Sequence, residues 1–294
     1  MGGKLMKRIY SSVVCLAALA VVACNKEGAQ TTGETLCANA YISSDATRTV
    51  YEVGNYGDKT GVKVSWDTAE SFRAYYDGGT APVVFSKTAA GTSFTAESVP
   101  EGVSVSTPFT GLYGSAATLN PDGKIDIDFS KQDGEADNLS AYDVMTATSE
   151  LKKGALSFAF KHNCAILRLK CVNHTIKPVS KVKLLFLKAQ VSVEFGGTGF
   201  YDTGDYISLS INLKTPVEAG SSEKGKGTVG FRYVIVPAIG YQKSSYEGIP
   251  IGEFDEFSNS IELSGTKSIE AGKVYDVLCE CGIEAGDDGY IWAD

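Results

Sequence analysis

The sequence predicts an all-β protein built from antiparallel β-sandwiches. Apolar and polar residues alternate with period two in many short stretches, which is the pattern of half-buried strands. The chain is also rich in Gly (32), Tyr (15) and Phe (13), residues that suit turns and strands. Its sequence offers no convincing amphipathic helix longer than two turns. Short strands joined by tight turns are typical of sandwich folds.

The expected strands follow one another along most of the chain. Turns are predicted at Asp77-Gly78-Gly79 and at Asn120-Pro121-Asp122-Gly123. The apolar phase shifts around His162-Asn163-Cys164, so we expect a bulge or bend there and a structural, hydrogen-bonded His162. Residues 131–140 are polar and acidic, and an exposed loop is expected. The strands are expected at residues 36–43, 62–66, 72–76, 83–85, 93–96, 109–113, 124–129, 156–160, 165–169, 182–186, 191–195, 207–214, 229–235 and 275–281.

Length and composition predict two domains. A chain of 294 residues is long for one ordinary domain, and its hydrophobic (43%) and charged (21%) fractions are near globular averages, so it can bury a core. The composition becomes more polar across residues 131–154. We therefore expect an N-terminal sandwich at residues 36–150 and a C-terminal sandwich at residues 151–294.

The first 35 residues predict an exported lipoprotein. A basic start precedes an apolar stretch of 14 residues at 9–22, shorter than the about 20 needed to span a bilayer but suited to a signal peptide. Val21-Val22-Ala23-Cys24 then resembles a bacterial lipobox, which predicts a signal peptide at residues 1–23 and acylation of Cys24. The alternative is an ordinary secretory signal. Residues 24–35 are a polar tether, and the start at Met1 or Met6 is open.

Charge and composition argue against several functions. The formal charge is −8, and removal of residues 1–23 would leave 24 basic against 35 acidic residues, or −11. Such a chain is a poor partner for nucleic acid. Two histidines leave little material for a His-based hydrolase or a zinc site. We expect no enzymatic activity, no cofactor and no metal site.

An odd number of cysteines remains after export, which leaves their state open. Cys279 and Cys281 lie two apart on one strand face, where a mutual disulfide is geometrically unfavourable. They could bridge to Cys164 or Cys171, or stay as buried thiols. A metal site formed with His162 is a further alternative. The five cysteines are Cys37, Cys164, Cys171, Cys279 and Cys281.

Two other motifs are incomplete. The segment from Gly220 to Gly227 is one residue short of a phosphate-binding loop, because the motif needs Ser or Thr at 227 and a helix after it. We expect a hairpin loop there instead. Asp122, Asp126 and Asp128 could ligate calcium, but their spacing is not that of an EF-hand, and exposed strand carboxylates are the simpler interpretation.

Several motifs in order resemble the fimbrillin-like proteins of the Bacteroidetes. They follow the lipobox and extend to the end of the chain: Thr47-Arg48-Thr49, Trp66-Asp67, the passage 142–147 followed by 156–162, the strand 233–237 ending in Pro, Ile269-Glu270-Ala271-Gly272-Lys273-Val274-Tyr275, and Ile291-Trp292. The resemblance implies two transthyretin-like Greek-key β-sandwich domains. It also implies a type V fimbrial subunit that serves cell adhesion at the outer membrane or cell surface, with other fimbrial subunits as partners.

The resemblance further implies a mechanism of assembly. In this family a protease cuts after an Arg, the first strand leaves, and a C-terminal segment of another subunit fills the groove, as an exposed sheet edge allows. Arg48 would be the cleavage site. The 13 residues after Cys281 reach roughly 40 Å when extended. The displaced strand would present Leu36, Ala38, Ala40 and Ile42, and the donor tail Ile283, Tyr290, Ile291 and Trp292.

A different class of function remains open. A monomeric surface lipoprotein could bind glycan through an aromatic patch of Tyr75, Tyr76, Tyr201 and Tyr206. The same tyrosines could equally be ordinary residues of a sheet face. The sequence does not distinguish a stalk, tip or anchor subunit, nor does it identify a host or bacterial surface ligand.

Overall fold

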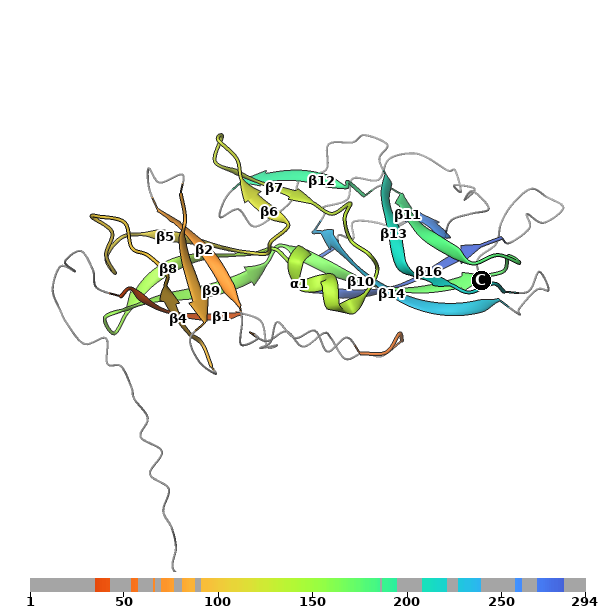
Figure 1. The fold of residues 1–294 in the computed structure, drawn as a ribbon, viewed down its shortest axis with the longest axis horizontal. Helices are drawn as coiled ribbons and strands as arrows, with labels where there is room; N and C mark the ends of the chain where they lie inside the picture. Colours follow the sequence, from red (N-terminus) through yellow and green to blue (C-terminus); the bar gives the residue numbers. More distant parts are fainter. Residues whose placement is uncertain are drawn as a thin grey trace, which may run out of the picture.

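The computed structural model describes residues 35–42, 54–57, 66, 70–76, 81–87, 91–185, 187–194, 208–220, 227–238, 257–260 and 269–282. These residues form a closed barrel, a six-stranded sheet and a three-stranded sheet. The barrel and the six-stranded sheet lie at opposite ends of the molecule, and the small sheet lies over the region between them (Figure 1). The predicted all-β fold is confirmed. No helix in the described part of the chain is long and apolar enough to cross a membrane.

The barrel is filled mainly by aromatic rings. Its strands run in the order β1-β4-β3-β2-β5-β8-β9, and β1 pairs with β9 to close it. Phe72, at the centre, has its ring 5.0–5.1 Å from those of Phe85, Phe94, Phe158 and Phe160. The strands are β1 (Cys37–Ile42), β2 (Ser71–Tyr76), β3 (Val83–Lys87), β4 (Ser93–Ala96), β5 (Phe109–Tyr113), β8 (Met145–Lys152) and β9 (Ala155–His162).

Gly111 in β5 makes room for these rings. A Cβ atom at this position would lie 2.9 Å from the ring of Phe160 and 3.0 Å from that of Phe158. Real Cβ atoms do not approach other atoms so closely, so a side chain here would push the rings out of their packing. Gly111 therefore permits the close packing of these rings in the barrel core.

The six-stranded sheet forms the other end of the molecule. Its order is β13-β11-β15-β16-β10-β14. β10 is the longest buried strand, and Arg168 on it forms an ion pair with Asp276 on β16 at 2.6 Å. The strands are β10 (Cys164–Asn173), β11 (Val179–Leu185), β13 (Ser208–Val217), β14 (Thr228–Pro237), β15 (Phe257–Ser260) and β16 (Val274–Cys281).

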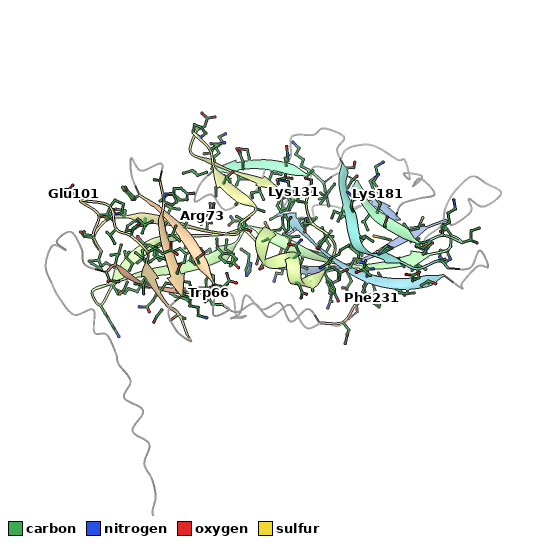
Figure 2. All side chains as sticks on the ribbon, viewed as in Figure 1. Trp66, Arg73, Glu101, Lys131, Lys181 and Phe231 are labelled. Atoms are coloured by element: carbon green, nitrogen blue, oxygen red, sulfur yellow. The ribbon has the colours of Figure 1, made fainter. Side chains whose placement is uncertain are left out.

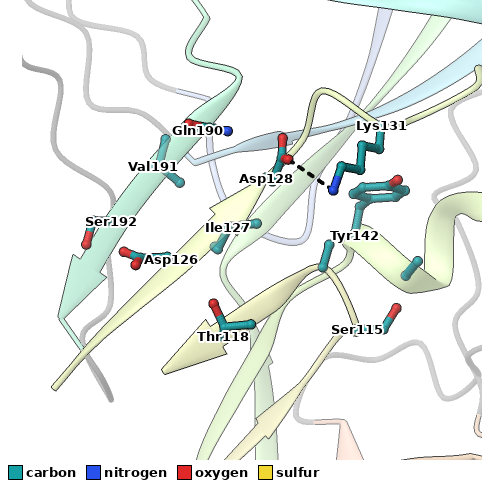
Figure 3. A pocket seen from close by; sticks show the side chains of 12 residues that line it. Ser115, Thr118, Asp126, Ile127, Asp128, Lys131, Tyr142, Gln190, Val191 and Ser192 are labelled. Atoms are coloured by element: carbon teal, nitrogen blue, oxygen red, sulfur yellow. Dashed lines mark ion pairs between the residues drawn. The ribbon is translucent and has the colours of Figure 1, made fainter. Parts of the chain in front are cut away.

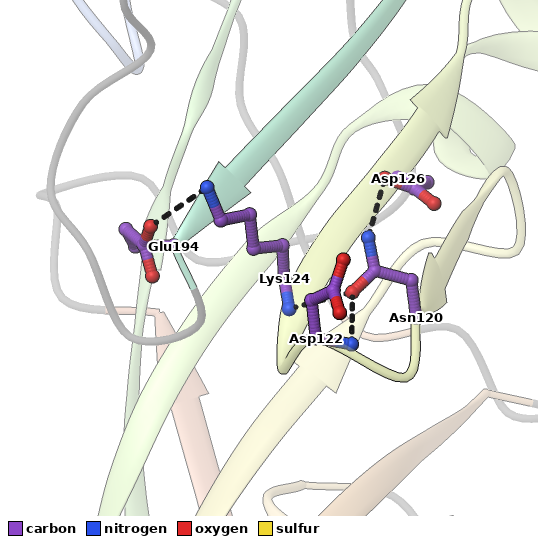
Figure 4. A network of polar contacts seen from close by, with 5 residues as sticks. All are labelled: Asn120, Asp122, Lys124, Asp126 and Glu194. Carbon is purple, nitrogen blue, oxygen red and sulfur yellow. Dashed lines mark hydrogen bonds and ion pairs between the residues drawn. The ribbon is translucent and has the colours of Figure 1, made fainter.

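The small sheet contains β6 (Ala117–Leu119), β7 (Lys124–Asp128) and β12 (Gln190–Glu194) in the order β12-β7-β6. The predicted turn between β6 and β7 is confirmed: the side-chain oxygen of Asn120 accepts hydrogen bonds from the backbone N–H groups of Asp122 and Lys124 (Figure 4). Lys124 also forms an ion pair with Glu194 of β12 at 3.2 Å. The turn and the ion pair fix the register of the three strands.

The sequence predicts antiparallel sandwiches, and most strand pairs are antiparallel, but three are parallel. β1 pairs parallel to β9, β10 parallel to β16, and β11 parallel to β15. Alternation along a strand shows which residues face the core but carries no information on the direction of its neighbours. The first sheet is also closed rather than split into two faces. The strand expected at 62–66 falls, apart from Trp66, outside the described residues.

Residues 131–140 are not the exposed loop that their polarity predicted. Gln132 is 4% exposed, and its side chain donates to the carbonyl oxygens of Phe129 and Ile235 and accepts from the N–H of Ile235. The segment continues as a 3-10 turn (Ala136–Asn138) and α1 (Leu139–Tyr142), with Leu139 buried. The polar side chain is buried here because it satisfies backbone groups that would otherwise be unpaired.

The expected hairpin loop at 220–227 is also wrong. A strand, β14, does follow the segment, but β13 and β14 stand at opposite ends of the strand order of the sheet and are not paired. The segment therefore connects two edge strands. Residues 221–226 themselves lie outside the described residues.

The predicted bend at His162-Asn163-Cys164 is confirmed. β9 ends at His162 and β10 begins at Cys164, so the chain passes from the barrel into the six-stranded sheet at Asn163. His162 is structural, as expected: its Nδ1 lies 2.8 Å from a carboxylate oxygen of Asp143. Asn163 accepts a hydrogen bond from the hydroxyl of Thr146. The domain boundary near residue 150 stays a prediction.

The His162–Asp143 pair predicts pH-dependent stability. Burial lowers the pKa of His162, but the attraction and hydrogen bond of the Asp143 carboxylate outweigh it, so the pKa in the folded state lies above 6.5. The protonated ring then stabilises the fold fully below about pH 6.5, and this contribution is lost as the pH rises through the raised pKa. We expect His162→Gln to lower the free energy of unfolding more at about pH 5.5 than at about pH 9.

Urea denaturation at the two pH values measures this difference. The control is Lys161→Gln, which changes the exposed neighbour on the same strand. An equal loss of stability for His162→Gln at both pH values would contradict the prediction.

Candidate functional site

β1 is buried on one face, as its sequence predicted. Leu36, which immediately precedes the strand, is 0% exposed, and the alternate residues Ala38, Ala40 and Ile42 are 3%, 0% and 4% exposed. The intervening residues of the strand are half-buried or exposed. The strand therefore supplies one complete stripe of the barrel core.

Both edges of β1 are paired. It runs antiparallel to β4 and parallel to β9, with Ala38 opposite Phe94 on one side and opposite Leu156 on the other. The backbone N–H of Ala40 donates to Thr92 at 2.9 Å, and that of Ala96 donates to the carbonyl of Leu36 at 2.8 Å. Removal of β1 would leave the edges of β4 and β9 without their partner, and an unpaired edge is a template for another strand.

The shape of the groove that β1 fills follows from its side chains. Ala38 and Ala40 are small, and they lie where β9 carries Leu156 and Phe158. A larger side chain at either position would compete with those residues for space. Leu36 and Ile42 fill the two ends. A strand that replaces β1 would therefore need small residues in the middle and could carry larger ones at its ends.

Trp66 contacts both this strand and the core of the barrel. Its indole Nε1–H donates to the carbonyl of Ala40 at 3.1 Å. Its ring makes edge contacts with those of Phe94, Tyr113 and Phe160 at 5.2–5.6 Å, and Figure 2 shows the residue within the barrel. Trp66 thus bridges the backbone of β1 and the aromatic core.

The remaining predicted site residues cannot be placed around this groove. Cys24, Arg48, Ile283, Tyr290, Ile291 and Trp292 all lie outside the described residues. The described C-terminal part ends with β16 and Gly282. The structure therefore shows how the first strand is held, whereas the roles of all these residues in cleavage and donation stay predictions.

The five cysteines of the described residues are thiols rather than disulfides. Cys164, Cys171, Cys279 and Cys281 are buried and Cys37 is half-buried. Cys171 and Cys279 are direct partners on β10 and β16. The hydrogen bond to Cys171, followed by burial, raises the pKa of the Cys279 thiol, and burial raises that of Cys164. Cys164 and Cys279 therefore stay protonated at neutral pH.

The two candidate metal sites are not assembled. Within the part of the chain that the structure describes, no three His, Cys, Asp or Glu side chains converge to hold a metal ion. This part includes His162, Cys164, Cys279 and Cys281, as well as the three aspartates 122, 126 and 128.

The aromatic patch is only partly described. Tyr75 is 8% exposed and belongs to the barrel core, so its ring face is not presented to a ligand. Tyr76 packs edge-on against Phe109, with 5.9 Å between the ring centroids. Tyr201 and Tyr206 lie outside the described residues. The two described tyrosines therefore behave as residues of a packed sheet.

Sequence reasoning missed two contacts near this site. It gave no role to Asp143, which pairs with His162, and it placed Trp66 in an expected strand and a motif without identifying its contact with Ala40. Both contacts join residues that are far apart in the sequence. No local pattern marks such partners, although a single Trp after a period-two stretch could have been tested as a core residue.

Comparison with known proteins was made at three levels. No protein-family model matches the chain, and no curated protein sequence matches it. Solved structures do match. One, described as a "putative cell adhesion protein" from Bacteroides ovatus, is 14% identical; the match covers 81% of this chain and 95% of that one, with a TM-score of 0.39. A protein of the same description from Bacteroides uniformis is 15% identical, with 80% and 96% covered and a TM-score of 0.38.

A fimbrial protein from Bacteroides ovatus also matches, at 12% identity and a TM-score of 0.32, with 88% of this chain and 53% of that chain covered. These three structural neighbours are Bacteroides proteins named for fimbriae or cell adhesion. At identities of 12–15% and TM-scores of 0.32–0.39, this similarity by itself assigns no function to the chain.

Proposed function

We propose that this chain is a structural subunit of type V fimbriae. In this proposal it is exported as a lipoprotein, assembles by protease-triggered strand exchange and serves cell adhesion at the outer surface. The barrel and the six-stranded sheet would be variants of two transthyretin-like Greek-key domains. One observation carries the proposal: β1, the first described strand, closes the barrel with one fully buried face and two paired edges.

The free energy that β1 contributes favours its replacement by another strand over its removal without replacement. Leu36 and Ile42 each contribute about 1.5–3 kcal/mol by burial, and the backbone hydrogen bonds to β4 and β9 add to this. A barrel without β1 would expose an apolar groove and two open edges. An extended segment from another subunit could restore both the burial and the pairing, which is the physics of β-augmentation.

The position of Arg48 in the sequence would make β1 removable. Arg48 follows Ile42 by six residues and precedes Trp66, so cleavage there would leave β1 held by noncovalent contacts alone. The predicted lipid site, Cys24, lies on the same side of the cut as β1. Cleavage would therefore release the rest of the chain from its membrane anchor at the same time as it frees the groove.

We also propose which partners bind this chain and that it is not a catalyst. Other fimbrial subunits would bind in the groove, and the outer membrane would hold the precursor. We propose no catalytic role and no nucleic-acid partner. The acidity of the chain supports the second point, because nucleic acid is itself negatively charged.

Cleavage at Arg48 should trigger assembly. Trypsin-like treatment of the mature protein is expected to convert monomers into polymers, because it frees the groove for a donor tail. Arg48→Lys keeps a trypsin site and should assemble, whereas Arg48→Ala should not, and truncation after Cys281 should also block assembly. SDS-resistant ladders and electron microscopy are the measurements. Cleaved full-length protein that stays monomeric at high concentration would overturn the mechanism.

Trp66→Phe should speed strand release. The change removes the hydrogen bond to Ala40 and keeps an aromatic ring, so we expect a loss of about 0.5–1.5 kcal/mol in the free energy of unfolding. Polymerisation after cleavage, followed by light scattering, should be faster than in the wild type. The matched control is Tyr76→Phe on β2, a strand of the same barrel that does not pair with β1. An unchanged rate for Trp66→Phe would show that this contact does not limit release.

Acylation at Cys24 can be tested separately. Cys24→Ala is expected to leave an uncleaved or mislocalised precursor, because the lipid-bearing thiol is lost. Cys15→Ala, within the signal peptide, is the control and should behave as the wild type. Membrane fractionation and the mass of the mature N-terminus report the result, and normal membrane recovery of Cys24→Ala would count against a lipoprotein.

A further inference from the structure

A cavity of about 710 Å³ lies beside the small sheet. Figure 3 shows it bordered by strands β6, β7 and β12 and by helix α1. Its volume is within the range of about 300–1,000 Å³ that is usual for small-molecule sites. The cavity is separate from the groove of β1, since its three strands pair with neither the barrel nor the six-stranded sheet.

Polar side chains from three strands line up across this cavity. Asp126 on β7 stands opposite Ser192 on β12 and Thr118 on β6, and Asp128 stands opposite Gln190. Residues two apart on a strand face the same side, and direct cross-strand partners share a face. One face of the sheet thus offers two carboxylates with hydroxyl and amide groups beside them.

Both carboxylates are held in place. Asp128 accepts hydrogen bonds from the hydroxyl and the backbone N–H of Ser130, at 2.5 and 3.0 Å, and lies 3.7 Å from the ammonium group of Lys131. The Ser130 hydroxyl is the main reason that the pKa of Asp128 is lowered, which keeps it ionised. Asp126 accepts a hydrogen bond from the amide of Asn120 at 3.1 Å (Figure 4).

These contacts leave room for a ligand. An ionised carboxylate can accept about four hydrogen bonds, so Asp126 and Asp128 retain capacity as acceptors for hydroxyl groups. Tyr142, at the end of α1, forms the opposite wall, and Figure 3 shows its ring beside Lys131 and Asp128. Burial raises the pKa of the Tyr142 hydroxyl, which therefore stays neutral.

We propose that this cavity binds a neutral saccharide, with the vicinal hydroxyls of one sugar ring donated to Asp126 and Asp128. The amide of Gln190 and the hydroxyls of Thr118 and Ser192 can both donate and accept, as a hydroxyl-rich ligand requires.

Other ligand classes fit less well. A phosphate or an acidic sugar would be repelled by the two carboxylates. A cation would be repelled by Lys131, and within the described residues no three metal-ligating side chains converge to hold a metal ion. An extended peptide needs an unpaired sheet edge, whereas the aligned carboxylates stand on the central strand of this sheet. The site would be the same whether the barrel contains its own β1 or a donor segment from another subunit. It would therefore serve adhesion both before and after assembly.

The test uses the uncleaved mature protein. An array of neutral and acidic oligosaccharides identifies the strongest binder, and calorimetric titration with that oligosaccharide gives its dissociation constant. Asp126→Asn removes the charge at nearly constant shape and should weaken binding about tenfold or more, the loss expected for a hydrogen bond to a charged group. Asp122→Asn, in the exposed turn of the same hairpin, should leave binding unchanged.

Ser192→Ala, on the neighbouring strand, provides a second variant should Asp126→Asn disturb the fold; it should weaken binding severalfold. The proposal is overturned if no neutral oligosaccharide binds, if Asp122→Asn weakens binding as much as Asp126→Asn, or if calcium alone, and no sugar, perturbs the NMR signals of the cavity. Polymerisation is measured separately, so failure of this site would leave the proposed assembly mechanism intact.

Discussion

The fit of β1 between β4 and β9 is the constraint on which the barrel depends. The closure needs small side chains in the middle of the strand, because Ala38 and Ala40 lie beside neighbours that fill the core with large residues. The same six-residue strand buries one face in the core and closes the barrel by its backbone pairing with β4 and β9. Because these contributions are concentrated in one segment near the start of the chain, one substitute strand could in principle replace all of them.

The two ends of the molecule are joined by polar contacts that depend on charge. At Asn163 the chain leaves the barrel, and the adjacent His162–Asp143 pair fixes that turn. The segment 54–57 adds a second link, since the backbone N–H of Gly57 donates to Asp276, which also pairs with Arg168. The ring of Tyr56 lies 6.0 Å from that of Phe231. These contacts connect a segment that follows β1 in the chain to the interior strand β16 and the edge strand β14 of the six-stranded sheet.

The small sheet differs from the other two sheets because its central strand has one apolar face and one acidic face. Its strands bury Ile125 and Ile127 on one side, while the alternate residues Asp126 and Asp128 carry charge on the other. A strand with one apolar and one acidic face can be stable and still present polar groups to a ligand. The Asn120 turn and the Lys124–Glu194 pair hold these groups in register without help from the barrel.

The sequence by itself determined the strand faces, the turn at Asn120 and the bend at Asn163. Period-two alternation identified Leu36, Ala38, Ala40 and Ile42 as one buried stripe, because side-chain direction along a strand is a local property. Only the tertiary structure decided that β1 runs parallel to β9 and that Gln132 is buried. It alone placed Ser192 opposite Asp126. These facts depend on which distant segments meet, and the free energy of such pairing comes from contacts that no local pattern records.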